Sequence, residues 1–151
     1  MAIIEKHLYR SVRIDDFSEG VLTEDGDAMD GILYGDIEPR TVTVDGNQTT
    51  RQDWRRGTGG YFKKGHGTSL WDKKGVFDYF YWHYFMLPKG TIIPDSLKLV
   101  EGSWSGRYQA THWQIEVATG GKLNADALRG ALDNLARNCV VRAIELDISL
   151  G

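Results

Sequence analysis

The first clear alternation of apolar and polar side chains lies at residues 7–14 and predicts a β-strand. One face of this strand carries Leu8, Val12 and Ile14. Arg10 falls on the same face. Because burying a charge is costly without a partner, we expect either that this strand opens into a cleft or that Arg10 pairs with a carboxylate.

Shorter segments with strand-like composition follow along the chain. Residues 41–44 predict a strand that ends in the turn pair Asp-Gly, and the aromatic run 76–87 is rich in β-prone side chains. Residues 91–93 and 97–100 are short strand candidates. In contrast, residues 15–40 are acidic and turn-rich, which predicts a long irregular segment with a short helix inside it.

The longest alternation runs through residues 107–117 and predicts a further strand. Its apolar face, which we expect to point toward the core, consists of Trp113, Ile115 and Val117. Its polar face consists of His112, Gln114 and Glu116. Three polar side chains on one strand face form either a solvated surface or part of a site.

The C-terminal region has the pattern of an amphipathic helix. Asn124 is a suitable N-cap, and Leu123 and Leu128 are spaced as a hydrophobic staple. Helical spacing then defines an apolar stripe of Leu128, Leu132, Leu135, Ala136 and Cys139. Residues 140–150 could either continue the helix or form a last strand. With no internal repeat and no linker, residues 1–151 are expected to form one α+β domain.

Composition changes this picture mainly through the distribution of charge. The 151 residues are 41% hydrophobic and 26% charged, which excludes wholesale disorder, and the net charge of −3 disfavours a dedicated nucleic-acid binder. However, residues 51–75 hold seven Lys/Arg against two Asp/Glu, whereas residues 1–50 hold four against eleven. Residues 57–67 also contain five glycines. This local excess of positive charge points to a confined anion site or to a solvated loop.

Several kinds of chemistry are disfavoured by residue spacing. The single Cys139 excludes a disulfide framework, and on an apolar helix stripe it is expected to be an inert buried thiol. The four histidines show no metal-ligand spacing. Residues 67–71 lack the second glycine of a serine-nucleophile elbow. The N-terminus lacks a signal-peptide pattern, and residues 76–87 are too short to span a bilayer.

One constellation remains as candidate chemistry. It combines the inward Arg10, the hydroxyl pair Thr68 and Ser69 after the glycine-rich loop, and the polar face that contains Gln114 and Glu116. Each member alone has a structural explanation: an ion pair, a helix N-cap and a solvated strand face. Together, in this order, they suggest an arginine that binds phosphate, a supporting hydroxyl and a carboxylate that stabilises developing positive charge.

The sequence around these residues resembles a family of bacterial toxins. The similar stretches lie at residues 8–12, 67–77, 88–94, 107–113 and 135–138, and the string Gly-Thr-Ser-Leu-Trp-Asp-Lys-Lys-Gly-Val-Phe at 67–77 is the most specific. The family comprises small cytoplasm-acting effectors that the type VI secretion system exports, with a fold similar to that of ADP-ribosyltransferases. The acidic residues 15–50 match it poorly.

The resemblance implies an ADP-ribosyltransferase-like fold of two small, mostly antiparallel β-sheets that form a cleft, with flanking helices. It also implies an NAD⁺ site and an NAD-dependent transferase activity. The implied cofactor-binding residues are Arg10, Thr68, Ser69, Tyr61 and Trp71. The implied catalytic residues are Ser69, His112, Gln114 and Glu116, of which Gln114-x-Glu116 is similar to a transferase signature. Which of the last three is catalytic stays open.

The resemblance also implies partners and a location. A producing cell must neutralise such an antibacterial toxin before export, so we expect a cognate immunity protein that blocks the cleft or a surface beside it. We further expect delivery by the type VI apparatus, without a signal peptide, from the producer's cytoplasm to that of a target cell. There the toxin would modify an unknown target, and no membrane association is expected.

Two other functions are compatible with the residues. A metal-independent ribonuclease toxin could use His112 and Glu116 as an acid–base pair, with Arg107 or Lys63 and Lys64 on phosphate. The basic residues 51–74 and their aromatic side chains would then hold RNA. Alternatively, the chain is a non-enzymatic domain whose aromatic patch at residues 79–85 docks a partner, provided that this patch is exposed.

Overall fold

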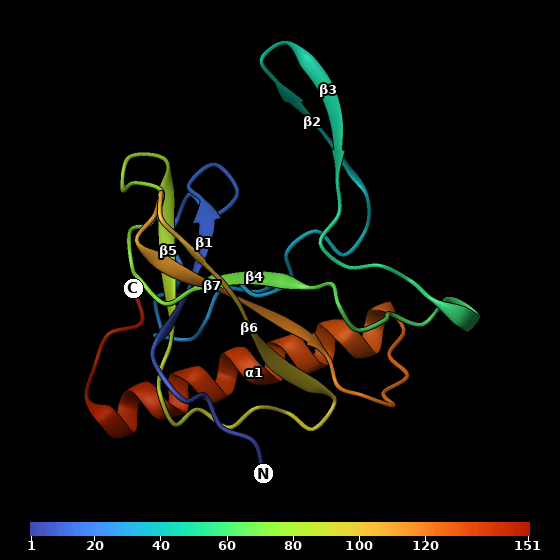
Figure 1. Ribbon diagram of the computed structural model, residues 1–151. Helices are drawn as coiled ribbons and strands as arrows, with labels where there is room; N and C mark the ends of the chain where they lie inside the picture. The colour runs from blue at the N-terminus through green and yellow to red at the C-terminus, as the bar shows by residue number, and fades with distance from the viewer.

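The computed structural model describes all of residues 1–151 and contains two antiparallel β-sheets and one long helix (Figure 1). The larger sheet has the order β5-β1-β4-β7-β6. Its strands are β1 (Leu8–Arg13), β4 (Thr68–Trp71), β5 (Trp82–Leu87), β6 (Leu97–Ser105) and β7 (Ala110–Val117). The smaller sheet is a hairpin of β2 (Arg40–Val44) and β3 (Asn47–Arg51), and a single 3-10 turn, η1, spans Thr58–Gly60. The predicted α+β class with two antiparallel sheets is therefore confirmed.

One helix, α1 (Ala125–Leu146), lies along one side of the larger sheet (Figure 1). As predicted, the Asn124 side chain caps it by accepting a hydrogen bond of 2.8 Å from the Ala127 N–H. The predicted stripe is buried along its whole length: Leu128, Leu132, Leu135, Ala136 and Cys139. The helix continues to residue 146, so the open question about residues 140–150 is answered mainly in favour of helix.

The larger sheet divides into two halves at β1. This strand pairs with β5 over six residue pairs, from Leu8 opposite Leu87 to Arg13 opposite Trp82. With β4 it pairs only where Tyr9 lies opposite Trp71. Beyond Tyr9, β1 therefore has no further registered pair with β4.

Three local predictions are wrong. Residues 15–40 contain no helix, because glycines with positive φ, including Gly20 at 102° and Gly26 at 85°, interrupt every stretch long enough to form one. In the aromatic run only residues 82–87 form a strand. Residues 76–81 instead form turns, in which the Asp78 carboxylate and the Tyr84 hydroxyl accept the backbone N–H groups.

The third wrong prediction is the strand at residues 91–93. There the backbone makes only an isolated bridge, between Ile92 and Ile3. Residues 107–109 form a turn, so the long alternating strand begins at Ala110. The single helix also replaces the several flanking helices that the resemblance implied.

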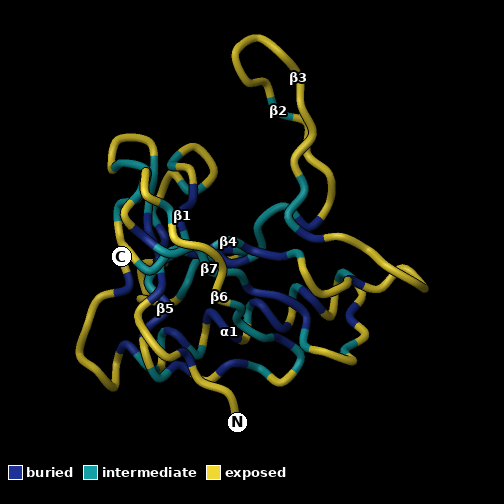
Figure 2. Tube along the Cα trace, in the orientation of Figure 1, coloured by how far each residue is buried: buried dark blue, intermediate teal, exposed yellow.

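The β2–β3 hairpin projects away from the rest of the molecule and is almost entirely exposed (Figures 1 and 2). Its turn is the predicted Asp45-Gly46 pair, where both residues have positive φ. An isolated two-stranded hairpin is marginally stable in water, so contacts at its base must hold it in place. No helix in the structure has the length and apolar character needed to cross a membrane.

Candidate active-site cleft

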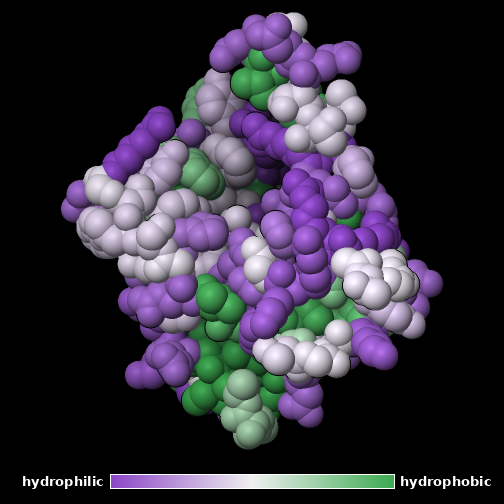
Figure 3. Space-filling view, turned by 45° about the vertical axis from the view of Figure 1, so that its right-hand side comes forward, coloured by the Kyte–Doolittle hydropathy of each residue, from purple (hydrophilic) through white to green (hydrophobic).

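A cavity of about 510 Å³ (hereafter the Arg10 cleft) lies between β1 and the base of the β2–β3 hairpin. Its walls are the end of β1, the base of the β2–β3 hairpin and the irregular segment before it. In the space-filling view a hollow lined largely by hydrophilic residues lies beneath the hairpin (Figure 3). The charged residues of its lining are Arg10, Arg13, Arg40, Arg51, Asp16, Asp30, Asp36 and Asp53.

Arg10 lies at the bottom of this cleft with incomplete hydrogen bonding. One terminal nitrogen of its guanidinium is 3.4 Å from the Ser69 carbonyl oxygen. Its Nε is buried and has no hydrogen-bond partner. Burial lowers the pKa of Arg10, and the nearby carboxylates of Asp53 and Asp36 partly offset this effect. Both expectations for this residue are thus met in part, since Arg10 faces a cleft and has carboxylates near it, although it forms no ion pair.

The carboxylates of the cleft hold the base of the hairpin. Asp53, just after β3, accepts a hydrogen bond from the Asp36 N–H. Arg40, at the start of β2, pairs with Asp36 at 3.0 Å and with Asp16 at 3.6 Å. Burial raises the pKa of Asp36, and Arg40 opposes this shift. The four acidic side chains of the cleft therefore balance its four arginines.

Backbone packing closes the bottom of the cleft. Gly35 has a φ of +61°, and a Cβ there would lie 2.7 Å from an Asp53 carboxylate oxygen and 3.2 Å from the Thr68 hydroxyl oxygen. Thr68 is fully buried, and its hydroxyl lies 2.7 Å from the Leu33 carbonyl and 3.1 Å from that of Tyr34. The Thr68 hydroxyl thus attaches the irregular segment to the start of β4.

The polar face of β7 continues onto β4. Ser69 lies directly opposite Gln114, so the two side chains share a face of the sheet with Glu116. The Gln114 amide donates to one Glu116 oxygen at 3.1 Å, and the Gly65 N–H donates to the other at 2.7 Å. Glu116 is only 6% exposed, so its carboxylate is a buried anion held by two donors. The structure therefore brings Ser69, Gln114 and Glu116 together.

Trp71 and His112 lie farther along the same two strands and on the same face. Trp71 packs edge-on against His112, with ring centroids 5.1 Å apart, and against Tyr108 at 5.3 Å. Burial lowers the pKa of His112, which favours the neutral imidazole. His112 and Glu116 are separated by four residues of extended strand, about 13 Å. That spacing does not favour the acid–base pair of a ribonuclease.

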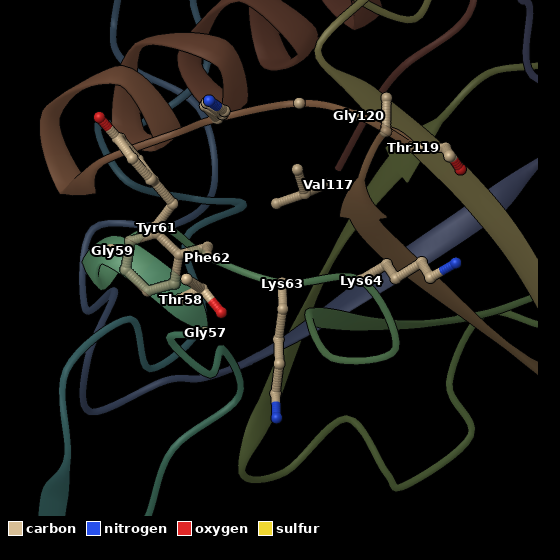
Figure 4. A pocket seen from close by; sticks show the side chains of 13 residues that line it. Gly57, Thr58, Gly59, Tyr61, Phe62, Lys63, Lys64, Val117, Thr119 and Gly120 are labelled. Carbon is tan, nitrogen blue, oxygen red and sulfur yellow. The ribbon is translucent and has the colours of Figure 1, made fainter.

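Tyr61 lies apart from the other candidates, in a second cavity of about 520 Å³ (Figure 4). This cavity, the lysine-rimmed pocket, is formed by the glycine-rich loop at residues 57–64 and by residues 117–122, which follow β7. It shares no lining residue with the Arg10 cleft. The candidate residues therefore fall into three groups: Arg10 in the cleft with Thr68 behind its wall, the polar face of β4 and β7, and Tyr61 in the second pocket.

The sequence reasoning missed the acidic and hairpin residues of the cleft. Asp36, Asp53, Arg40 and Arg51 come from a segment in which no periodicity marks a surface. The one available signal was the local density of acids before residue 50, which could have suggested partners for Arg10. The structure also contains no group of three or more His, Cys, Asp or Glu side chains arranged to bind a metal ion.

The aromatic run contributes an exposed surface next to the cleft. Tyr79, Phe80 and Tyr81 are 65%, 79% and 55% exposed, whereas the β5 side chains Tyr84 and Phe85 are buried. The Arg13 guanidinium, which lines the cleft, lies 5.6 Å from the centre of the Tyr81 ring. Part of the predicted aromatic patch is therefore accessible, and it lies beside the Arg10 cleft.

Comparisons with known proteins identify the family of the chain. The model of a family described as Tse2 ADP-ribosyltransferase toxin matches residues 3–144. Over 84 residues the chain is 38% identical to the toxin Tse2 of Pseudomonas aeruginosa. That alignment covers 52% of this chain and 48% of the relative, so the chain matches about half the length of that toxin.

Proposed function

The chain belongs to the Tse2 ADP-ribosyltransferase toxin family, and from this premise we propose that it is an antibacterial toxin that transfers ADP-ribose from NAD⁺ to a target. The observation that carries the proposal is the Arg10 side chain, with an unpartnered Nε at the bottom of a cleft of about 510 Å³. Ligand pockets commonly have volumes of roughly 300–1,000 Å³. The cleft is therefore of a suitable size for a dinucleotide.

The charges of the cleft fit the parts of NAD⁺. A guanidinium binds diphosphate oxygens in a bidentate manner, and the Arg10 guanidinium has only the 3.4 Å contact with the Ser69 carbonyl within the protein. Carboxylates accept hydrogen bonds from ribose hydroxyls, and Asp36 and Asp53 line the same cavity. We assign the diphosphate to Arg10 and a ribose to the acidic side of the cleft.

We place the chemistry on the polar face of β4 and β7, whose residues do not line the Arg10 cleft. In the transfer, the bond between nicotinamide and ribose breaks, its electron pair leaves with nicotinamide, and positive charge develops on the ribose carbon. A buried carboxylate such as Glu116 stabilises that charge. The acceptor then bonds to the ribose carbon and loses a proton. Ser69 and Gln114 orient the nicotinamide half of NAD⁺. Thr68 positions β4 through its buried hydroxyl, and Trp71 positions it through the packing of its ring.

Partners follow from the same proposal. The toxin is delivered to the target-cell cytoplasm by the type VI apparatus, and a cognate immunity protein neutralises it in the producer. The exposed side chains of Tyr79, Phe80 and Tyr81 support a docking surface for this protein beside the cleft. An immunity protein seated there would cover the approach to Arg10.

The experiment measures nicotinamide release from NAD⁺ by the purified protein, together with growth after expression in a bacterial cytoplasm. We expect wild type to release nicotinamide and arrest growth. Arg10→Lys keeps the charge but loses the bidentate geometry, and Glu116→Gln removes the anion while keeping the shape. Each is expected to lower release at least about tenfold, which corresponds to about 1.4 kcal/mol.

Arg107→Lys is the matched control, because Arg107 is exposed in the turn before β7 and lines neither pocket. It should behave as wild type. Full activity and toxicity in both Arg10→Lys and Glu116→Gln would overturn the proposal. Degradation of total RNA in the absence of NAD⁺ would instead support the ribonuclease alternative.

A further inference from the structure

The lysine-rimmed pocket has a charge pattern unlike that of the rest of the molecule. Its thirteen lining residues include Lys63, Lys64 and Lys122 and no acidic side chain. The protein as a whole has a net charge of −3. None of these three lysines forms an ion pair, whereas Arg40, Arg56, Arg129 and Arg142 all do. No ion pair within the protein therefore compensates the positive charge of these lysines.

Carboxylates on the adjoining segments are already engaged. Glu116, which precedes the pocket residue Val117, accepts from Gly65 and Gln114. Asp126, in the first turn of α1, pairs with Arg129. Neither acid forms an ion pair with the lysines, and an anion from outside the chain is a partner that this surface fits.

Backbone donors point to the same kind of ligand. The N–H groups of Lys64, Thr119 and Gly120 donate to no acceptor within the protein. Thr119 and Gly120 are consecutive residues of one turn, and the φ of Gly120 is +80°. Successive free N–H groups in such a turn form a concave donor site for anions.

Lys63 and Lys64 do not converge on one point. Figure 4 shows the Lys63 and Lys64 side chains pointing in different directions from the loop, with Tyr61 on the side away from Lys64. Charges spread along a loop fit successive phosphates of a chain better than they fit a single phosphate. The Tyr61 ring is 40% exposed and provides a surface on which a base can stack.

We propose that the lysine-rimmed pocket binds the phosphodiester backbone of a single-stranded nucleic acid, and that this strand is the acceptor of ADP-ribose. The acceptor role rests on the proposed function, whereas the binding itself does not. The pocket adjoins the polar face, because Lys64 is followed by Gly65, whose N–H binds the Glu116 carboxylate at 2.7 Å. A strand held by the lysines would therefore pass close to the end of β7.

The test is fluorescence anisotropy of a labelled single-stranded RNA oligonucleotide with the full chain, at salt concentrations between about 50 and 200 mM. Three phosphate contacts predict a slope of about −2 for log affinity against log salt. Lys63→Glu combined with Lys64→Glu should weaken binding at least about tenfold and flatten that slope toward about −0.7. Lys89→Glu is the control, because exposed Lys89 contacts the C-terminal half of α1, at the end opposite Lys122.

Arg10→Lys separates the two proposals, because it should impair NAD⁺ binding and leave RNA binding unchanged. RNA binding by a wild-type protein that binds no NAD⁺ would retain the nucleic-acid site and remove its acceptor role. No binding by wild type, or equal binding by the double variant, would overturn the inference. Displacement of RNA by AMP, or by polyglutamate at equal charge, would also overturn it, since the pocket would then accept a mononucleotide or an acidic protein.

Discussion

The Arg10 cleft and the lysine-rimmed pocket are cavities of similar volume that handle charge in opposite ways. In the cleft, four arginines are balanced by four aspartates, and Arg10 is only partly exposed. In the pocket, three exposed lysines face no acid. A site whose charges are already paired is organised before its ligand arrives. Exposed lysines instead attract anions through charge that solvent and salt screen, and their side chains can change conformation to fit the ligand.

Under the proposed function, the comparison teaches that positive charge alone does not identify the cofactor site. By sequence, the basic segment at residues 51–75 is the more conspicuous candidate for a dianionic ligand. In the structure, the least exposed arginine of the cleft is instead Arg10 on β1, which belongs to the acidic segment of residues 1–50. Organisation by neighbouring carboxylates, rather than net charge, distinguishes the cleft.

The largest expected effect is at Gly67, where the glycine-rich loop leads into β4 and the two regions meet. A Cβ at this position would lie 1.6 Å from the Ile115 carbonyl oxygen, so Gly67→Ala must displace β7 from β4. We expect a loss of about 3 kcal/mol in unfolding free energy. Thermal unfolding should show a fall in Tm of roughly 6–12 °C.

The matched control for Gly67 is Gly130, an exposed glycine inside α1 with open space where its Cβ would be. Gly130→Ala should stabilise the protein by about 0.5–1 kcal/mol. If both substitutions change Tm equally, the close approach of β4 and β7 does not limit stability as described.

The second prediction concerns a substitution that disrupts the Arg10 cleft and leaves the lysine-rimmed pocket unchanged. Asp53→Ala leaves the buried Asp36 N–H without an acceptor and removes a carboxylate near Arg10. Urea unfolding should show a loss of about 2 kcal/mol. Asp25→Ala, in an exposed turn, should remain within about 0.5 kcal/mol of wild type. Equal losses in both variants would contradict a cleft organised by its carboxylates.

A smaller effect concerns Tyr34, which lines the cleft and donates a 2.8 Å hydrogen bond to Asp133 on α1. Tyr34→Phe should cost about 1 kcal/mol at neutral pH. Burial raises the pKa of Tyr34 to about 12, with a further contribution from the Asp133 hydrogen bond. The stability difference should therefore be constant below pH 10 and disappear as pH rises through 12.

Denaturation of wild type and Tyr34→Phe at several pH values measures this difference. A difference that grows as pH rises above 10 would have the wrong sign for a tyrosine whose protonated form stabilises the fold.

The smallest expected effect is on the pocket side of the comparison. Because Lys63 and Lys64 are exposed and unpaired, replacing both with Glu should change unfolding free energy by less than about 0.5 kcal/mol. Thermal unfolding checks this expectation. A loss of several kcal/mol would mean that the lysines are part of the structure and not a free binding rim.

Much of the fold could be predicted because its signals are local. The α1 stripe, the Asn124 cap, the alternation in β7 and the Asp45-Gly46 turn each occupy a short window of sequence. The resemblance to a toxin family, found in short strings around Thr68 and Ser69, is confirmed by the family match over residues 3–144.

The rest depends on contacts between distant residues. Asp36 and Asp53 reach the cleft through an irregular segment whose path is set by its glycines and by the Thr68 hydroxyl. No sequence pattern indicated that β1 would pair with β4 at a single position. The separation of Tyr61 from Arg10 follows from that topology, because residues 57–64 pack beside the end of β7.

The most direct test of the central claim is calorimetric titration of NAD⁺ into three proteins: wild type, Arg10→Lys, and Lys63→Glu combined with Lys64→Glu. If the Arg10 cleft holds NAD⁺, Arg10→Lys should weaken binding at least about tenfold, while the lysine double variant binds as wild type does. The reverse pattern, with NAD⁺ affinity lost in the lysine variant and kept in Arg10→Lys, would contradict this account.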